Sequence, residues 1–434
     1  MDEGFIRNNS YQTLLELITE EGINASGKDE VYGCIFGRDS AITILKILNI
    51  LRKPDSKKYI DRKLLLSACR RSLLGLVALQ GTEINLESGE EPGKFIHEYR
   101  KDKFERLVNR PVPWFVYPDG KLRNYDSIDS TPLALIAIYR YYKLTKDNKF
   151  ILQVLPSVER GLEWIMTFAD KDKDYLLEYE FHGKRKYGGL VVQSWTDSVE
   201  SLRQKDGKFP LYPIAPVEVQ GYAWLALKLW SDFYLTLVPQ TKRNIRFGRK
   251  LFLHSQMLKK RFNETFISEN SGLPFPVQGL DGRKNQIRTI TGNPLLLLWA
   301  SYYKDGKRES ILEHRYVYSL VKRAFLNDLF DKEAGIRTMS DLSETYNSGL
   351  DSYHNGSFWP KLNGMTYEGL LKWRFIKEAK MLRHASLMPI HHFKTPIELY
   401  VKVENSYSEY RNERGQTSCK KQAWSAASIL DLVV

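Results

Sequence analysis

The chain has 434 residues, of which 42% are apolar and 27% are charged, and its formal net charge is +13. This composition is sufficient for one large hydrophobic core or two ordinary domains, and the many aromatic residues exclude disorder over the bulk of the chain. Because the lysines and arginines are scattered as pairs and triplets, they indicate a solvated basic surface and not a face that binds nucleic acid.

Cysteine usage and apolar runs exclude further classes of protein. Cys34, Cys69 and Cys419 fit neither a disulfide framework nor a zinc site, which favours a reducing, cytoplasmic compartment. No apolar run approaches the ~20 residues of a membrane span, and the N-terminus has no apolar signal core. His391 and His392 lack a third ligand at a metal-like spacing. We therefore expect no membrane or nucleic-acid partner, no metal and no cofactor; the oligomeric state stays open.

Helical periodicity dominates the first half of the chain. Residues 1–30 are predicted to form a lead-in, with a short amphipathic helix near 14–18 and a polar turn at 22–28. Thr131 followed by Pro132 is typical of an N-cap with proline at the first helical position. Helices are predicted at residues 39–51, 61–79, 133–142 and 157–168, and a short hairpin is predicted at 175–189.

The second half repeats this pattern without a linker or an exact sequence repeat. Helices are predicted from residue 218 and at 243–263, 295–303, 312–326, 367–384 and 424–432. Because no composition break divides the chain, residues 31–434 are predicted to form a single domain. A series of helices in pairs is compatible with an (α/α)6 toroid, but periodicity equally allows a bundle or a solenoid.

Two long segments carry the residues typical of a sugar site. Residues 83–126 are broken by glycines and prolines, and long structured loops are often functional. Residues 191–222 gather Trp195, Asp197 and Glu218 around a loop. A pair of carboxylates can carry out the proton transfers of glycoside hydrolysis, and tryptophan offers a flat face to a sugar ring. The alternative is a solvated acidic loop with one core tryptophan.

Seven motifs in order resemble one enzyme family. They are FGRDSAI at 36–42, GEEPGKFIHEYR at 89–100, YDSIDSTPLAL at 125–135, WTDS at 195–198 with PIAPVEVQGY at 213–222, GIRTMS at 335–340, YHNGSFWP at 353–360 and SCKKQAWSAASIL at 418–430. From about residue 31 onwards, the chain resembles the glucosidase domain of glycogen debranching enzymes, the amylo-α-1,6-glucosidase family. The resemblance implies an all-α (α/α)6 toroid of the glucoamylase-like kind. It also implies an inverting hydrolase that releases glucose from α-1,6 or α-1,4 linkages of a carbohydrate substrate.

The resemblance also implies the two catalytic carboxyl groups. The aspartate of the W-x-D motif, Asp197, corresponds to the general acid, and its neighbour Trp195 is expected to raise its pKa by desolvation. The family's base lies in a Pro-Glu-Leu motif near the C-terminus. Here that motif is interrupted by Ile397, which makes Glu398 the expected base and Glu404 the reserve. An inverting pair is expected to be roughly 6.5–9.5 Å apart.

Further motif positions are expected to bind the sugar. Arg38 and Asp39 resemble a pair that grips sugar hydroxyls; the alternative is a helix cap at Asp39 and a surface Arg38. A plain carboxylate at a helix N-terminus is the alternative for Glu218. The remaining expected substrate-binding residues are His97, Glu98, Asp126, Asp129, Trp195, Glu218, Gln220, His354, Asn355 and Trp359.

Two departures from the family pattern leave the substrate open. The family usually continues with His-Asp-Asn where this chain has Lys361-Leu362-Asn363, and it often has a histidine where this chain has Leu296. These changes favour a second possibility, a toroid hydrolase of a small sugar such as a trehalase-like or mannosylglycerate-type enzyme. The interrupted base motif favours a third, a catalytically silent carbohydrate-binding protein.

Overall fold

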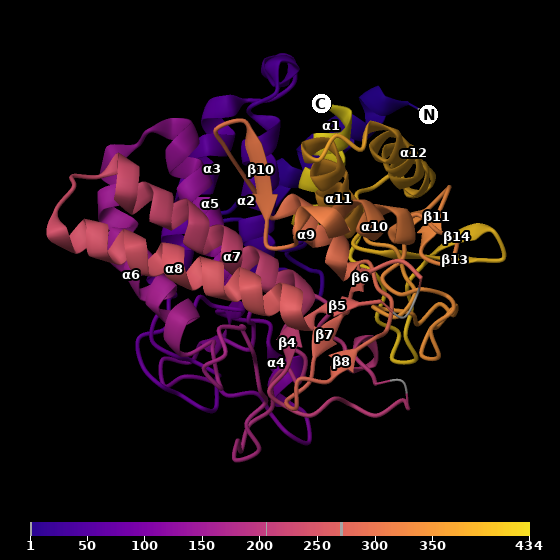
Figure 1. Cartoon of the computed structure of the whole chain (residues 1–434). Helices are drawn as coiled ribbons and strands as arrows, with labels where there is room; N and C mark the ends of the chain where they lie inside the picture. Colours follow the sequence, from indigo (N-terminus) through magenta and orange to yellow (C-terminus); the bar gives the residue numbers. More distant parts are fainter. Residues whose placement is uncertain (1, 205, 270–271) are drawn as a thin grey trace.

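A closed ring of helices forms the centre of the computed structural model, which describes residues 2–204, 206–269 and 272–434 (Figure 1). Each ring helix packs on the next in chain order, and the last packs on the first. These helices are buried nearly all round, as their apolar sequences predict. The inner ring consists of α2 (Gly37–Ile50), α5 (Ser130–Thr145), α7 (Val217–Asp232), α9 (Leu296–Trp299), α11 (Pro360–Lys372) and α13 (Ala423–Val433).

A second set of helices covers this ring from outside. Each outer helix packs on an inner helix or on the 3-10 turn Asn293–Leu295 that precedes α9. The outer helices are α1 (Glu3–Glu16), α3 (Arg62–Ala78), α6 (Asn148–Thr167), α8 (Lys242–Thr265), α10 (His314–Ala324) and α12 (Ile376–Phe393). Two nested rings of helices make the fold an (α/α)6 toroid, which confirms the expectation drawn from the resemblance.

Short antiparallel sheets, with two to four residues per strand, lie in the loops that connect the helices of the toroid. Such strands are too short to give an alternating pattern, so the sequence did not predict them. Together with the four-residue helix α4 (Glu105–Val108), most of them lie in the loop-rich half at the bottom of Figure 1 or at its right edge. The sheets are β1 (Ile35–Phe36), β2 (Glu98–Arg100) and β3 (Leu122–Asn124); β4 (Ala215–Pro216), β7 (Gly279–Leu280) and β8 (Gln286–Ile287); β5 (Ile267–Ser268) and β6 (Phe275–Pro276); β9 (Ser301–Lys304) and β10 (Lys307–Ser310); β11 (Phe330–Asp331) and β12 (Gly335–Ile336); and β13 (Tyr400–Val403) and β14 (Ser406–Glu409).

Several predicted elements differ from the structure. The prediction of a hairpin at 175–189 is wrong. Tyr179 pairs with Ile214 and Gly188 pairs with Trp114, so the two halves of this segment pair with other parts of the chain. The helix expected at 295–303 ends at Trp299 and turns into β9.

Two further helix predictions are wrong in their bounds. The helix expected at 367–384 is two helices, because Arg374 adopts a left-handed φ of 63° between α11 and α12. The helix expected at 157–168 begins at Asn148, where Asp147 caps it, and continues through Pro156.

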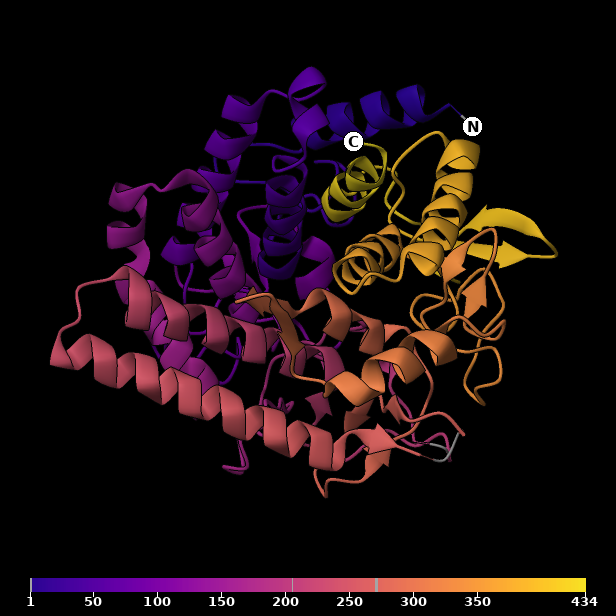
Figure 2. The ribbon, with the colours of Figure 1, turned by 45° about the horizontal axis from the view of Figure 1, so that its top comes forward.

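The N-terminal segment packs against the C-terminal part of the chain. Helix α1 packs on α13, and Figure 2 shows the two side by side. The carboxylate of Glu3 accepts hydrogen bonds of 2.9 and 2.7 Å from the Arg383 guanidinium of α12. We propose that residues 31–434 form one catalytic domain with the lead-in 1–30 fastened to it through α1. Within the described residues, no helix combines the length and apolarity needed to cross a bilayer.

Candidate active site

Three of the inner helices, α2, α11 and α13, begin at one cavity of about 170 Å³. Its wall includes Arg38 and Asp39 from the first turn of α2, Trp359 before α11, and Gln422 and Trp424 at the start of α13. The family motifs converge here because several of them begin an inner helix. The expected site residues that line the cavity are Arg38, Asp39, His97, Glu98, Trp195, Asp197, His354, Trp359 and Glu398.

A glycine allows α2 to begin directly against β2. The amide of Gly37 donates a 2.9 Å hydrogen bond to the carbonyl of His97. A Cβ at position 37 would lie 1.9 Å from the carbonyl oxygen of Ile96. Only glycine permits this approach, which brings Arg38 and Asp39 beside His97 and Glu98.

The side chain of Arg38, in the cavity wall, bridges two carboxylates. Its guanidinium donates hydrogen bonds of 2.8 Å to Asp197 and 3.4 Å to Asp129, and a third of 3.1 Å to the carbonyl of Ser194. The alternative of a surface arginine is therefore wrong, since Arg38 is buried. The alternative of a helix cap at Asp39 is also wrong, because Phe36 holds the N-cap position of α2.

Because these contacts fix the direction of Asp197, we expect Arg38→Lys to lower kcat/KM by at least about 10²-fold. Lysine keeps a positive charge for the buried Asp129 but cannot reach two carboxylates and a carbonyl in one plane. Steady-state kinetics with a thermal melt would measure the loss, with Arg123→Lys in the exposed pair with Asp119 as the control. A rate within threefold of the wild type would show that Arg38 does not position the acid.

The Glu398 carboxylate, which also lines the cavity, accepts hydrogen bonds on both of its oxygens. Its Oε1 accepts a 2.7 Å hydrogen bond from the Tyr353 hydroxyl, and its Oε2 accepts one of 2.9 Å from the Cys419 amide. The hydroxyl of Tyr32 lies 3.0 Å from that of Tyr353. Burial raises the pKa of Glu398 to about 7, and both hydrogen bonds oppose this rise by favouring the ionised carboxylate.

We expect Tyr353→Phe to move the acidic limb of the kcat/KM–pH profile to higher pH. If Glu398 is the base, as the resemblance implies, it acts when ionised, so the rate should fall as the pH drops through its pKa of about 7. Removing the hydrogen bond from Tyr353 raises that pKa further. The profile should be compared with that of Tyr407→Phe, since the Tyr407 hydroxyl bonds the carbonyl of Glu333 away from the cavity. An acidic limb that stays in place would contradict this role for Glu398.

Aromatic and imidazole rings form the rest of the wall. The rings of His354 and Trp359 stack at a centroid distance of 4.8 Å, and Trp195 meets both edge-on. The indole of Trp195 donates to Asn293 at 3.1 Å, which fixes its plane. Burial lowers the pKa of His97 and His354 well below the usual value, so both imidazoles are neutral.

Other expected residues lie behind the wall and do not line the cavity. Asp129 is buried under Arg38. The side-chain amide of Gln220 forms hydrogen bonds with the backbone of Leu177 and Pro216. The side-chain amide of Asn355 forms hydrogen bonds with Ser352 and Thr345 of its own loop. Glu218 is fully buried in the first turn of α7, and neither of its oxygens has a hydrogen-bond partner in the described part of the chain.

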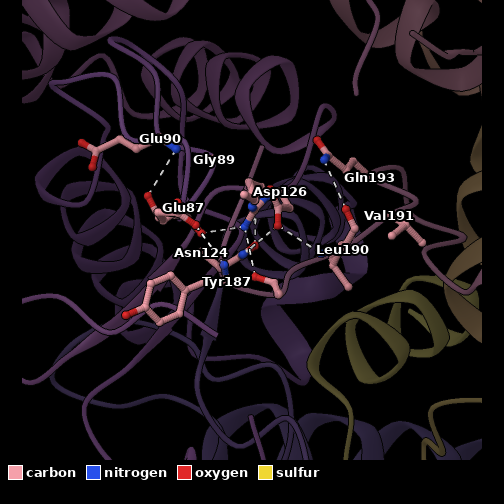
Figure 3. A network of polar contacts seen from close by, with 12 residues as sticks. Glu87, Gly89, Glu90, Asn124, Asp126, Tyr187, Leu190, Val191 and Gln193 are labelled. Carbon is pink, nitrogen blue, oxygen red and sulfur yellow. Dashed lines mark hydrogen bonds and ion pairs between the residues drawn. The ribbon is translucent and has the colours of Figure 1, made fainter. Parts of the chain in front are cut away.

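Asp126 fastens two loops outside the cavity (Figure 3). Its carboxylate accepts hydrogen bonds of 2.9 Å from Asn124, 3.0 Å from the Leu190 amide and 2.7 Å from Arg185. A Cβ at Gly189 would lie 2.1 Å from it, so this approach requires glycine. Asp126 lines a second, smaller cavity and supports the segment that carries Leu190 to the first.

The structure separates Glu398 from the reserve base. Glu404 lies at the turn between β13 and β14 and lines a different cavity, with Asp331 and Lys402. Ile397, the inserted residue, is buried among apolar side chains. Sequence analysis missed the cavity residues Tyr32, Arg106, Trp114, Tyr353, Gln422 and Trp424. Tyr353, Gln422 and Trp424 lie inside the family motifs described above, so those motifs could have identified them as site residues.

One carboxylate cluster in the described residues has the spacing of a metal site. Asp170, Asp172 and Asp174 bring their oxygens within 4.8 Å of one another. The ammonium of Lys284 already lies 2.9 Å from Asp172 and 3.0 Å from Asp174. A lysine ammonium therefore already pairs with two of the three carboxylates of this cluster, which lies outside the candidate active site.

A family model described as amylo-alpha-1,6-glucosidase matches residues 76–431. The chain belongs to the amylo-alpha-1,6-glucosidase family. This match to a glycoside hydrolase family covers the motifs that begin α5, α7, α11 and α13, whereas the FGRDSAI motif that begins α2 lies before it. No curated protein shows significant sequence similarity to the chain.

Solved structures of other glycosidases share the fold of this family member. The GH63 mannosylglycerate hydrolase from Thermus thermophilus, solved with glucose, aligns with a TM-score of 0.68 at 13% identity over 98% of this chain and 99% of that one. A metal-independent alpha mannosidase from Streptococcus pneumoniae gives 0.61 at 15% identity over 99% and 93%. A rhamnosidase from Klebsiella oxytoca gives 0.59 at 14% identity over 99% and 63%.

Proposed function

We propose that the chain is an inverting α-glucosidase that releases glucose from α-1,6 or α-1,4 linkages of a glycogen-like glucan or short oligosaccharide. In this proposal Asp197 protonates the leaving oxygen, and Glu398 takes a proton from the attacking water on the other side of the sugar. The observation that carries it is that both carboxyl groups line one cavity, together with Arg38, Asp39 and aromatic rings.

The surroundings of the two carboxyl groups give each a distinct protonation bias. Burial raises the pKa of Asp197, and the ion pair with Arg38 opposes this rise. Burial also raises the pKa of Glu398, to about 7, and the hydrogen bonds from Tyr353 and the Cys419 amide oppose that rise. A substrate whose hydroxyls accept hydrogen bonds from Arg38 would weaken the ion pair between Arg38 and Asp197, so that Asp197 could hold a proton.

A second candidate is hydrolysis of a sugar attached to an anionic group, as in a mannosylglycerate-type enzyme. Arg106 lines the cavity from α4, next to Leu107 and Trp114. A guanidinium at this wall suits a carboxylate on the departing group. The mannosylglycerate hydrolase named among the similar structures acts on such a substrate, which supports the candidate.

A substrate panel distinguishes the two candidates. Purified protein would be incubated with isomaltose, maltose, trehalose, limit dextrin and mannosylglycerate, and the released sugar measured. We expect glucose from isomaltose or limit dextrin, at a rate unchanged by EDTA since two carboxyl groups supply the acid and the base. Activity on mannosylglycerate alone, lost in Arg106→Gln, would establish the second candidate instead. Sugar binding without any hydrolysis would support the binding-protein alternative.

A further inference from the structure

A fully buried lysine lies directly beneath the wall of the candidate active site. Lys361 is the second residue of α11, and its side chain is 0% exposed. Its Nζ lies 3.7 Å from the centroid of the Trp195 ring and 5.5 Å from that of Trp424. Both tryptophans line the cavity on which the proposed function rests. The ammonium is thus held by two aromatic faces that the sugar site also uses.

This position is unfavourable for a cation unless something nearby requires it. The Nζ of Lys361 has no hydrogen-bond partner in the described residues. It also sits at the N-terminal end of a helix, where the dipole repels positive charge. Burial of a charge without hydrogen bonds is costly, so an apolar side chain would be more stable here. The compensating interaction must come from the charges that surround it.

Three carboxylates on different elements lie near Lys361: Asp39 on α2, Asp129 before α5 and Glu218 on α7. Burial and the nearby Arg38 lower the pKa of Lys361 to about 7, and the three carboxylates oppose this fall by favouring the ammonium form. Gln422, the N-cap residue of α13, and Trp424 in its first turn are uncharged, and so is Asn293 before α9.

Arg38 cannot serve all of these carboxylates. Its Nη atoms are engaged with Asp129 and Asp197, and its Nε is 3.9 Å from the nearest oxygen of Asp39. Asp39 also has a 3.4 Å contact from the Gln422 amide. Burial raises the pKa of Asp39 to about 7; Arg38 lowers it, Asp197 and Glu398 raise it, and Lys361 lowers it. Arg38 shares its charge among three carboxylates, whereas Lys361 forms no ion pair with a carboxylate in the described part of the chain and is the second cation that acts on Asp39.

We propose that Lys361 is a positioning residue of the sugar site: from between Trp195 and Trp424 it adds to Arg38 a second counter-charge that helps to keep Asp39 an ionised acceptor for sugar hydroxyls. An ionised carboxylate accepts hydrogen bonds on both oxygens, whereas a protonated one presents an O–H group and weaker acceptors. This inference rests on the proposed function for the identity of the ligand only.

The test compares Lys361→Met with Lys372→Met. Methionine fills a buried lysine site without charge. Lys372 is the matched control, because it lies on the same helix with its Nζ 5.1 Å from the Trp299 ring, and it pairs with Glu368 at 2.8 Å away from the cavity. Binding of glucose and of mannose would be measured by calorimetry between pH 5.5 and 9. Should Lys361→Met fail to fold, Lys361→Gln replaces it.

Loss of the cation should raise the pKa of Asp39, so that affinity falls away at higher pH than in the wild type. A rise of about one unit would reduce the ionised fraction at pH 7 from about one half to about one tenth, and affinity about fivefold, with near-equal affinity at pH 9. Lys372→Met should keep the wild-type midpoint. Equal weakening at every pH, or none, would make Lys361 a packing residue and overturn the proposal.

A measurement without ligand separates this inference from the proposed function. The carboxyl 13C resonance of Asp39, assigned by its loss in Asp39→Asn, would be titrated in both methionine variants. A midpoint that moves up only in Lys361→Met supports the proposed counter-charge even if neither sugar binds, in which case the proposed function fails alone. A midpoint that stays in place contradicts the role of Lys361 whatever the protein binds.

Discussion

Glu398→Gln is expected to lower kcat by about 10²–10⁴-fold on every glycoside, because the attacking water loses the base that removes its proton. The change keeps the side-chain volume; the amide oxygen of glutamine can accept from the Cys419 amide, and its NH2 group can donate to the Tyr353 hydroxyl, which donates in the wild type. The loss should therefore appear without a change in melting temperature. Azide, which attacks without losing a proton, should restore part of the rate.

Glu404→Gln is the matched control for this substitution. Glu404 lies at the β13–β14 turn, and its change should leave the rate within twofold of the wild type. Wild-type rates in Glu398→Gln with a loss in Glu404→Gln would transfer the role of base to Glu404. Full activity in both variants would exclude the proposed pair altogether.

Asp197→Asn should have an effect that depends on the leaving group. On a disaccharide, whose leaving oxygen needs a proton, we expect a loss of about 10²–10⁴-fold. Fluoride leaves without a proton, so the rate of hydrolysis of a glycosyl fluoride should fall far less. The alkaline limb of the pH profile, which reports deprotonation of the acid, should also disappear. Asp206→Asn, in the exposed pair with Lys208 on the same loop, is the control.

The same two substrates test the order of the roles. If Asp197→Asn lost the same factor on both, while Glu398→Gln spared the fluoride, Glu398 would be the acid and Asp197 the base. The pairing of Asp197 with Arg38 in the free protein makes this comparison necessary.

The ring architecture was only partly accessible to periodicity. The apolar stretch that became α5 is recognisable as buried on all sides, and so are α7 and α13. Closure of the ring depends on α13 packing against α2, a contact between the two ends of the chain that has no local pattern. Helix α9 has four residues, too few for a helical repeat. The choice of a toroid over a bundle therefore came from the motifs.

The site was predicted where a motif begins an inner helix, as at Arg38 and Trp359. Motif membership alone was a poorer guide to orientation. The Asp126 carboxylate binds Arg185 outside the cavity, and the side-chain amide of Gln220 is hydrogen-bonded to the backbone of Leu177. These partners are distant in the sequence, so no spacing could have shown them.

Lys361 was visible in the sequence only as a departure from the family pattern. Its burial beneath Trp195 depends on how α11 meets the loop that carries Asp197. A lysine in the first turn of a helix is ordinarily solvated, so composition and periodicity gave no reason to place it under the site.

The anomer of the released sugar tests the central claim most directly. Proton NMR would follow hydrolysis of the best α-linked substrate from the panel, at early times before mutarotation. If Asp197 and Glu398 act on opposite sides of the sugar with a water between them, the β-anomer appears first and the α-anomer grows in only by mutarotation. Initial release of the α-anomer would contradict the account, since it requires a covalent intermediate on one of the two carboxylates.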